Sequence, residues 1–98
     1  MIIQVLDRIS PTLEDPDTFT AFHVNAPGLD LTRVVAALGG DAVPGDDDHV
    51  WIAIERLHRL GATHGGSDWR KGCDGMIEYA RSQGWVDADD RVRAHIET

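Results

Sequence analysis

The clearest hydrophobic pattern in the chain lies between residues 67 and 84. Five side chains recur there at the spacing of one helical face, namely Trp69, Cys73, Met76, Ile77 and Ala80. Ser67 is a suitable N-cap, because its hydroxyl can accept a hydrogen bond from an unpaired amide of the first turn. Gly84 supplies the left-handed backbone that ends many helices. The pattern predicts a helix with one buried face, and charged residues occupy its opposite face.

Two glycines interrupt this predicted helix. A glycine inside a helix costs about 1 kcal/mol relative to alanine, so each one needs a compensating reason. Gly72 lies on the apolar side beside Trp69 and Cys73, and we expect another backbone or a large ring to approach it closely. Gly75 projects away from the apolar stripe, and the sequence offers no reason for it.

The hydrophobic period changes from helical to alternating after Gly84. The turn-forming run 87–90 separates Trp85 and Val86 from a segment, 91–96, in which alternate residues are apolar, and this predicts a β-hairpin. A helix followed by a small hairpin resembles the layout of a winged-helix domain, which implies a helix that enters a DNA groove. Acidic residues outnumber basic ones across the segment, whereas a DNA-binding face needs an excess of Lys and Arg. We therefore do not expect nucleic-acid binding.

The central segment, 46–61, predicts a second helix. The acidic run Asp46–Asp48 would form its cap and first turn, Gly61 would end it, and one face between them is apolar, with Val50, Ala53, Ile54, Leu57 and Leu60. A strand over 50–54 is the alternative, because five consecutive apolar residues carry no period. We favour the helix because its apolar face continues through Leu60.

A helix in this segment leaves two large apolar side chains outside the core. Ile52 would point away from the core, and Trp51 would lie at its margin. An exposed apolar patch usually marks a partner surface. We therefore predict an interface at Trp51 and Ile52, and a homodimer is the simplest partner, because closed two-fold pairs are the commonest assemblies.

The first half of the chain predicts one further helix and two ambiguous segments. Asp30 can cap a helix over 31–38, which the Gly39-Gly40 pair would end. The segments 2–9 and 18–24 fit a helix and a strand equally well, and we favour helices. The expected fold is a mainly α, compact single-domain helical bundle over residues 1–98 with a small C-terminal β-hairpin. If the two ambiguous segments are strands, the fold is α+β instead.

The composition of the chain indicates the cellular compartment in which we expect this domain. The 98 residues carry a net charge of -8 and a single cysteine, so no disulfide framework is possible within the chain. The N-terminal segment lacks a basic leader and a small-residue cleavage site, and no apolar run reaches the length of a membrane span. We expect a cytoplasmic protein without membrane contact, in which Cys73 is a small core residue rather than a nucleophile.

The 5 histidines raise the question of a metal site. His58 and His64 flank the turn before the best-defined helix, and Asp68 and Cys73 lie inside that helix, so the ligand types would suit zinc. Their spacing matches no compact ligand motif. We therefore predict neither a metal site nor a cofactor.

The loop 63–67 is the candidate ligand site. It ends at a helix N-terminus, where unpaired amides favour anions, and His64 could act as a donor or base there, with Asp68 and His58 nearby. A turn made by Gly65 and Gly66 accounts for the same residues, and we favour that interpretation. The sequence identifies no catalytic residue.

Three functions remain in order of preference. The first is a small, acidic, non-catalytic accessory or interaction protein that self-associates or binds a protein partner. The second is a small enzyme or ligand-binding protein that uses the loop around His64. The third is a DNA-binding protein with a winged-helix layout.

Overall fold

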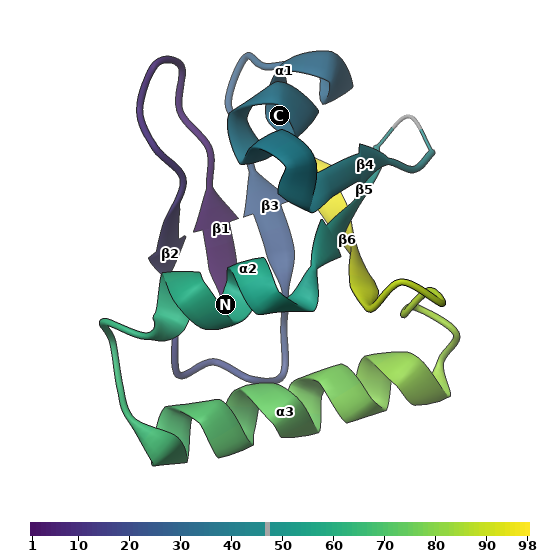
Figure 1. The fold of residues 1–98 in the computed structure, drawn as a ribbon. Coiled ribbons are helices and arrows are strands. Elements are labelled where there is room, and N and C mark those ends of the chain that lie inside the picture. The colour runs from purple at the N-terminus through teal and green to yellow at the C-terminus, as the bar shows by residue number, and fades with distance from the viewer. Residues whose placement is uncertain (47) are drawn as a thin grey trace.

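The computed structural model describes residues 1–46 and 48–98 and has an α+β architecture (Figure 1). Six strands form one sheet: β1 (Ile2–Gln4), β2 (Thr12–Glu14), β3 (His23–Asn25), β4 (Ala42–Pro44), β5 (His49–Ala53) and β6 (Arg91–Glu97). The described helices are α1 (Leu31–Leu38), α2 (Ile54–Gly61) and α3 (Ser67–Ser82), and a short 3-10 turn, η1 (Gly39–Asp41), follows α1.

The sheet is mixed, and its strand order is β2-β1-β3-β6-β5-β4. β1 pairs antiparallel with β2 and parallel with β3. β6 pairs parallel with β3 and antiparallel with β5, which also pairs antiparallel with β4. The last strand of the sequence therefore lies in the middle of the sheet and joins an N-terminal group of strands to a central pair.

One face of the sheet forms the core. Strand residues alternate between buried and partly exposed, and the strand register places the buried ones on a common face, with Ile3, Leu13, Val24, Ala42, Val50, Ile52, Val92, Ala94 and Ile96. All three helices contribute to the same core cluster, with Val34, Leu38, Leu57, Trp69, Cys73 and Ile77 among their buried residues. The opposite face of the sheet, which we call the open face, keeps partial exposure along its strands.

The prediction of a mainly helical bundle was wrong, and the α+β alternative describes the fold. The segment 2–9 forms β1 followed by a turn, and the segment 18–24 passes through turns before it enters β3. Their short apolar runs fit both periods, so local sequence did not decide between them. The sheet decided, because Ile3 pairs with Leu13 on one side and with Val24 on the other.

The central segment is part strand and part helix. β5 covers His49–Ala53 and α2 covers Ile54–Gly61, so a single helix over the segment 46–61 was wrong, although a helix does end at Gly61. Asp46 and Asp48 of the predicted cap instead lie between β4 and β5, where the Asp46 carbonyl accepts a hydrogen bond from the His49 amide at 3.0 Å. Asp47 lies outside the described residues.

This change of element reverses the position of Ile52. Because successive strand residues point to opposite faces, Ile52 enters the core and is 0% exposed, whereas Trp51 lies on the open face and is half-buried. The expectation that Ile52 points away from the core, and with it the predicted interface role of Ile52, was wrong. Trp51 alone keeps access to solvent.

The C-terminal strand alternates as predicted but does not form a wing. Val92, Ala94 and Ile96 are buried on β6. Val86 makes only an isolated bridge with Val92. β6 instead pairs with β3 and β5 within the sheet. The predicted hairpin is therefore reduced to the short pairing at Val86, and β6 belongs to the sheet rather than to a separate wing.

Local helix signals were reliable where they involved glycine or Asp30. Asp30 caps α1 by accepting a hydrogen bond from the Arg33 amide at 2.9 Å, and Gly39 follows the helix with a φ of 63°. Gly84 has a φ of 81°, and the Trp85 amide donates to the Ala80 carbonyl at 2.9 Å, so α3 ends in a Schellman-type turn. The predicted cap at the start of α3 was wrong, because Ser67 is already helical and the cap position is Gly66, which has no side chain to accept a hydrogen bond.

Candidate functional site

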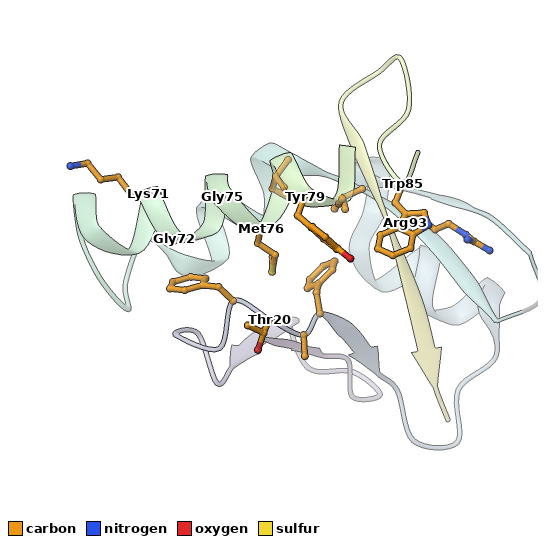
Figure 2. Close-up of a pocket in the computed structure, with 14 residues that line it drawn as sticks. Thr20, Lys71, Gly72, Gly75, Met76, Tyr79, Trp85 and Arg93 are labelled. Atoms are coloured by element: carbon orange, nitrogen blue, oxygen red, sulfur yellow. The ribbon is translucent and has the colours of Figure 1, made fainter. Parts of the chain in front are cut away.

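An apolar groove of about 520 Å³ lies between α3 and the segment 19–22 that leads into β3 (Figure 2). Phe19 and Phe22 line it from that segment, and Met76 and Tyr79 line it from α3. Trp85, just beyond α3, adds another aromatic ring. Large apolar side chains from distant parts of the sequence therefore share one open surface, which we call the groove.

A second stripe on α3 forms one wall of the groove. Gly72, Gly75, Met76 and Tyr79 all line it, and their spacing is that of one helical face. This stripe lies beside the core stripe that contains Trp69, Cys73 and Ile77. The spacing of these four residues is present in the sequence. It does not stand out as an apolar stripe, because two of the positions are glycines, which contribute no apolar side chain to a periodic pattern.

The two glycines of the groove wall have different surroundings. A Cβ at Gly72 would collide with the ring of Phe19, so the expectation of a large ring against Gly72 is confirmed. A Cβ at Gly75 would meet no atom within 4 Å. Packing inside the chain therefore does not require glycine at position 75, and the backbone of α3 is open to the groove there.

The rim of the groove is aromatic and accessible. Tyr79 is 62% exposed and Trp85 is 39% exposed. Their ring centroids lie 6.1 Å apart, with an angle of 68° between the ring planes, which is an edge-to-face contact. The turn at Gly84 holds Trp85 in this place, and the Trp85 carbonyl accepts a hydrogen bond from the Arg93 amide at 2.8 Å. The rim is therefore set by backbone contacts on both sides of Trp85.

The charged groups along the groove are cationic. Lys71 lies at one end and Arg93 at the other (Figure 2). No carboxylate lines the described groove, although the chain has a net charge of -8. Arg93 is held by Asp46, whose Oδ2 lies 3.1 Å from Nη2, and this Asp46 side chain is largely exposed. The charged side chains of the groove lining are therefore positive, whereas the net charge of the chain is negative.

The residues predicted to bind a ligand are not gathered around the loop 63–67. His64 and Asp68 are exposed on either side of the start of α3. His58 instead lines a polar cleft of about 990 Å³ between α2 and α3, and neither His64 nor Asp68 belongs to its lining. The structure thus pairs His58 with α3 rather than with the loop.

Inside this cleft His58 meets a carboxylate. Its Nε2 lies 3.1 Å from Oδ1 of Asp74, and Nε of Arg70 donates to the same oxygen at 3.3 Å. Cys73 is adjacent in sequence but buried in the core. Burial raises the pKa of its thiol to about 11, the charge of Asp74 adds to the rise, and Arg70 opposes it. The thiol is therefore protonated at neutral pH, which agrees with the predicted role of Cys73 as a core residue.

The other histidines form a row on the open face of the sheet. His95 on β6 pairs in register with His23 on β3 and with His49 on β5. The rings of His49 and His95 have centroids 5.4 Å apart, and Asp48 lies between them, with Oδ1 2.8 Å from Nδ1 of His49 and Oδ2 3.4 Å from Nε2 of His95. Burial tends to raise the pKa of Asp48, but the charge of His49 and hydrogen bonds hold it below its usual range. Sequence reasoning missed this row, because only the strand register brings the three rings together.

Across residues 1–46 and 48–98, no group of three or more His, Cys, Asp or Glu has a geometry that could hold a metal ion. Within the same residues, none of the helices is both long enough and apolar enough to span a bilayer. Comparisons with protein-family models, curated proteins and solved structures give no match to this chain.

Proposed function

We propose that this chain is a small, acidic, non-catalytic accessory protein that binds a protein partner through the groove. The observation that carries the proposal is an open, aromatic-rimmed groove with 62% of Tyr79 exposed. Tyr, Trp, Phe, Met and Arg are the residue types enriched at protein interfaces, and all of them line this groove. Exposed aromatic rings beside a concavity are also the usual anchors of binding energy.

The groove replaces the interface that the sequence suggested. Ile52 belongs to the core, so only Trp51 of the predicted pair is available for contact. The groove offers more apolar surface than Trp51 does, because Phe19, Phe22 and Tyr79 contribute to it together. We therefore place the partner at the groove and leave the open face around Trp51 as the secondary surface.

A partner other than a second copy of this chain fits the groove better. A concave groove needs a convex apolar element, and each helix in the described residues already turns its apolar stripe into the core. A second copy could insert a helix into the groove only by unpacking that helix, so a homodimer would have to pair the two grooves face to face. A different protein with an exposed apolar helix would fill the groove without such unpacking.

The residues of the groove favour binding over catalysis. Its polar lining consists of Thr20, Lys71, Tyr79 and Arg93, without an acid, a histidine or a cysteine to move a proton or attack a substrate. His58 and Asp74 lie in the separate polar cleft. The single, buried cysteine supports a reducing, cytoplasmic setting for this role.

Site-specific photo-crosslinking tests the proposal. A benzophenone side chain placed at Tyr79, at Trp85 or at the exposed His64 would be activated in cells that produce the protein. The expected result is one defined adduct from positions 79 and 85 and none from position 64. The purified adduct partner should then bind the wild-type chain and Tyr79→Phe, but lose at least about tenfold in affinity for Tyr79→Asp, which corresponds to 1.4 kcal/mol.

Several outcomes would contradict the proposal. Equal adducts from position 64 and position 79 would show that capture does not depend on the groove. A partner that binds Tyr79→Asp as well as wild type would place the interface elsewhere. An adduct between two copies of this chain, together with a dimer in sedimentation, would make the occupant a second copy.

A further inference from the structure

The length, the exposed glycine and the charges of the groove indicate which kind of segment would bind there. We propose that the occupant is an acidic amphipathic helix of the partner, which crosses α3 closely at Gly75 and directs carboxylates toward Lys71 and Arg93. This inference rests on the proposed function, since it assumes that a protein segment binds in the groove. Three separate observations support it.

The first observation is the length of the groove wall. The lining residues of α3 extend from Lys71 to Ala80. At a rise of 1.5 Å per residue this wall is about 14 Å long, which matches roughly two and a half turns of a second helix. A helix of that length presents apolar anchors at the i, i+4 and i+7 positions, which is how amphipathic helices fill hydrophobic grooves.

The second observation is Gly75. A glycine in a helix interior costs about 1 kcal/mol relative to alanine, and in this chain a Cβ at position 75 would have open space around it. Nothing in the packing of the described residues compensates that cost. The distance between packed helix axes depends on the side chains at the contact, so a missing side chain lets a second helix approach more closely. A partner helix at Gly75 would supply the compensating contact.

The third observation is the sign of the charges. Lys71 and Arg93 lie at opposite ends of the groove, and the groove has no acidic lining residue (Figure 2). Because Arg93 is already paired with Asp46, a basic helix would be repelled mainly at Lys71, and an acidic helix would find its most favourable charge there. Such complementary charges mainly set specificity and the rate of association, and salt weakens them. The preference for acid should therefore decrease as ionic strength rises.

Two synthetic helices test this inference directly. Both carry Leu, Phe and Leu at the i, i+4 and i+7 positions and a hydrocarbon staple on the outer face, which makes them equally helical. One carries Glu at the positions that flank the apolar stripe, and the other carries Lys. We expect the Glu helix to bind the wild-type chain about tenfold more tightly at low salt, as measured by fluorescence anisotropy.

Variants of the groove locate the contact. Lys71→Glu should abolish the preference for the Glu helix, because it removes the cation at one end. Gly75→Leu should weaken both helices at least about tenfold, because its side chain occupies the crossing point. Asp74→Leu, in the neighbouring position on the other side of α3, is the matched control and should leave both affinities unchanged. Circular dichroism of each variant shows whether its fold is retained.

The outcomes separate this inference from the proposed function. Equal binding of the Glu and Lys helices would overturn the acidic occupant, and full binding to folded Gly75→Leu would overturn the crossing at Gly75. If neither helix binds while position 79 still cross-links a partner, the inference fails and the proposed function stands. If cross-linking at position 79 also fails, both are wrong.

Discussion

Two neighbouring stripes of α3 are packed in opposite ways. The core stripe, with Trp69, Cys73 and Ile77, is buried against the sheet and α2. In the groove stripe, Gly75 and Tyr79 are exposed, and Gly72 and Met76 are half-buried. A helix that only supported the fold would need the first stripe alone. The difference indicates that the core stripe stabilises the fold, whereas the groove stripe is the surface that our proposal assigns to a partner.

The largest expected effect comes from removing the largest side chain of the core stripe, Trp69. Trp69 is 4% exposed, and its Nε1 donates a hydrogen bond to the Pro16 carbonyl at 2.9 Å. Trp69→Ala should lower the free energy of unfolding by about 3–5 kcal/mol, because it leaves a cavity and an unpaired carbonyl. Urea denaturation measures this loss. A change below about 1 kcal/mol would contradict the division between the two stripes.

The next-largest expected effect concerns Gly72, which belongs to the groove stripe and lies next to Cys73 of the core stripe. Gly72 touches the ring of Phe19, so Gly72→Ala forces that ring to move. We expect the variant to lose about 2 kcal/mol of stability, because overpacking outweighs the better helix propensity of alanine. Phe19→Leu in the same chain should recover part of the loss by making room, and thermal melts of the single and double variants measure this. A more stable Gly72→Ala single variant would show that Phe19 is not packed there.

A smaller effect concerns the rim of the groove and depends on pH. Burial tends to raise the pKa of Asp87, but hydrogen bonds from the Arg91 side chain and from the backbone amides of Arg91 and Asp89 outweigh it and hold the pKa below its usual range. A folded-state pKa below the unfolded value of about 3.9 stabilises the protein above that pH, and the contribution is lost as pH falls through the folded-state pKa. Acid should therefore loosen the segment that holds Trp85.

Indole N–H signals in NMR spectra separate the rim from the core during an acid titration. We expect the Trp85 signal to shift at a higher pH than the Trp69 signal. Asp87→Asn should remove this early shift and cost about 1–2 kcal/mol of stability at neutral pH. Simultaneous shifts of both signals in the wild-type chain would show that the rim and the core unfold as one unit.

The smallest expected effect is a gain in stability rather than a loss. Gly75→Ala should raise the free energy of unfolding by up to about 1 kcal/mol, because alanine favours the helix and its Cβ meets no neighbour. The same variant should bind the partner helix more weakly than wild type. Thermal melts and anisotropy on one sample measure both quantities. A variant that is more stable and binds equally well would leave Gly75 without a functional reason.

Sequence reasoning succeeded where one residue controls the local backbone. Asp30, Gly39 and Gly84 marked helix ends correctly, because a cap or a positive φ is a local requirement. The core stripe of α3 was also predictable, since its side chains repeat at the helical period. The strand at His49–Ala53 was not, because five consecutive apolar residues satisfy a helix and a strand alike.

The sequence predicted only part of the candidate site. Gly72 signalled the approach of a large ring, but the identity of Phe19 depends on a turn more than fifty positions earlier in the chain. Ile52 was assigned to an interface because a helix was assumed, and the strand placed it in the core instead. The histidine row required the register of β3, β5 and β6, which no local pattern contains.

By itself the sequence determined the helices α1 and α3, the cap of α1, the C-terminal ends of both helices, the buried stripe of α3 and the net negative charge. These follow from forces that act between residues close in the chain, such as capping, helical periodicity and the backbone freedom of glycine. The tertiary structure decided which apolar runs became strands, where β6 entered the sheet and which residues came to face Gly72 and Gly75. Those outcomes depend on pairing between distant segments, and the free energy of burying each segment exists only once its partners are in place.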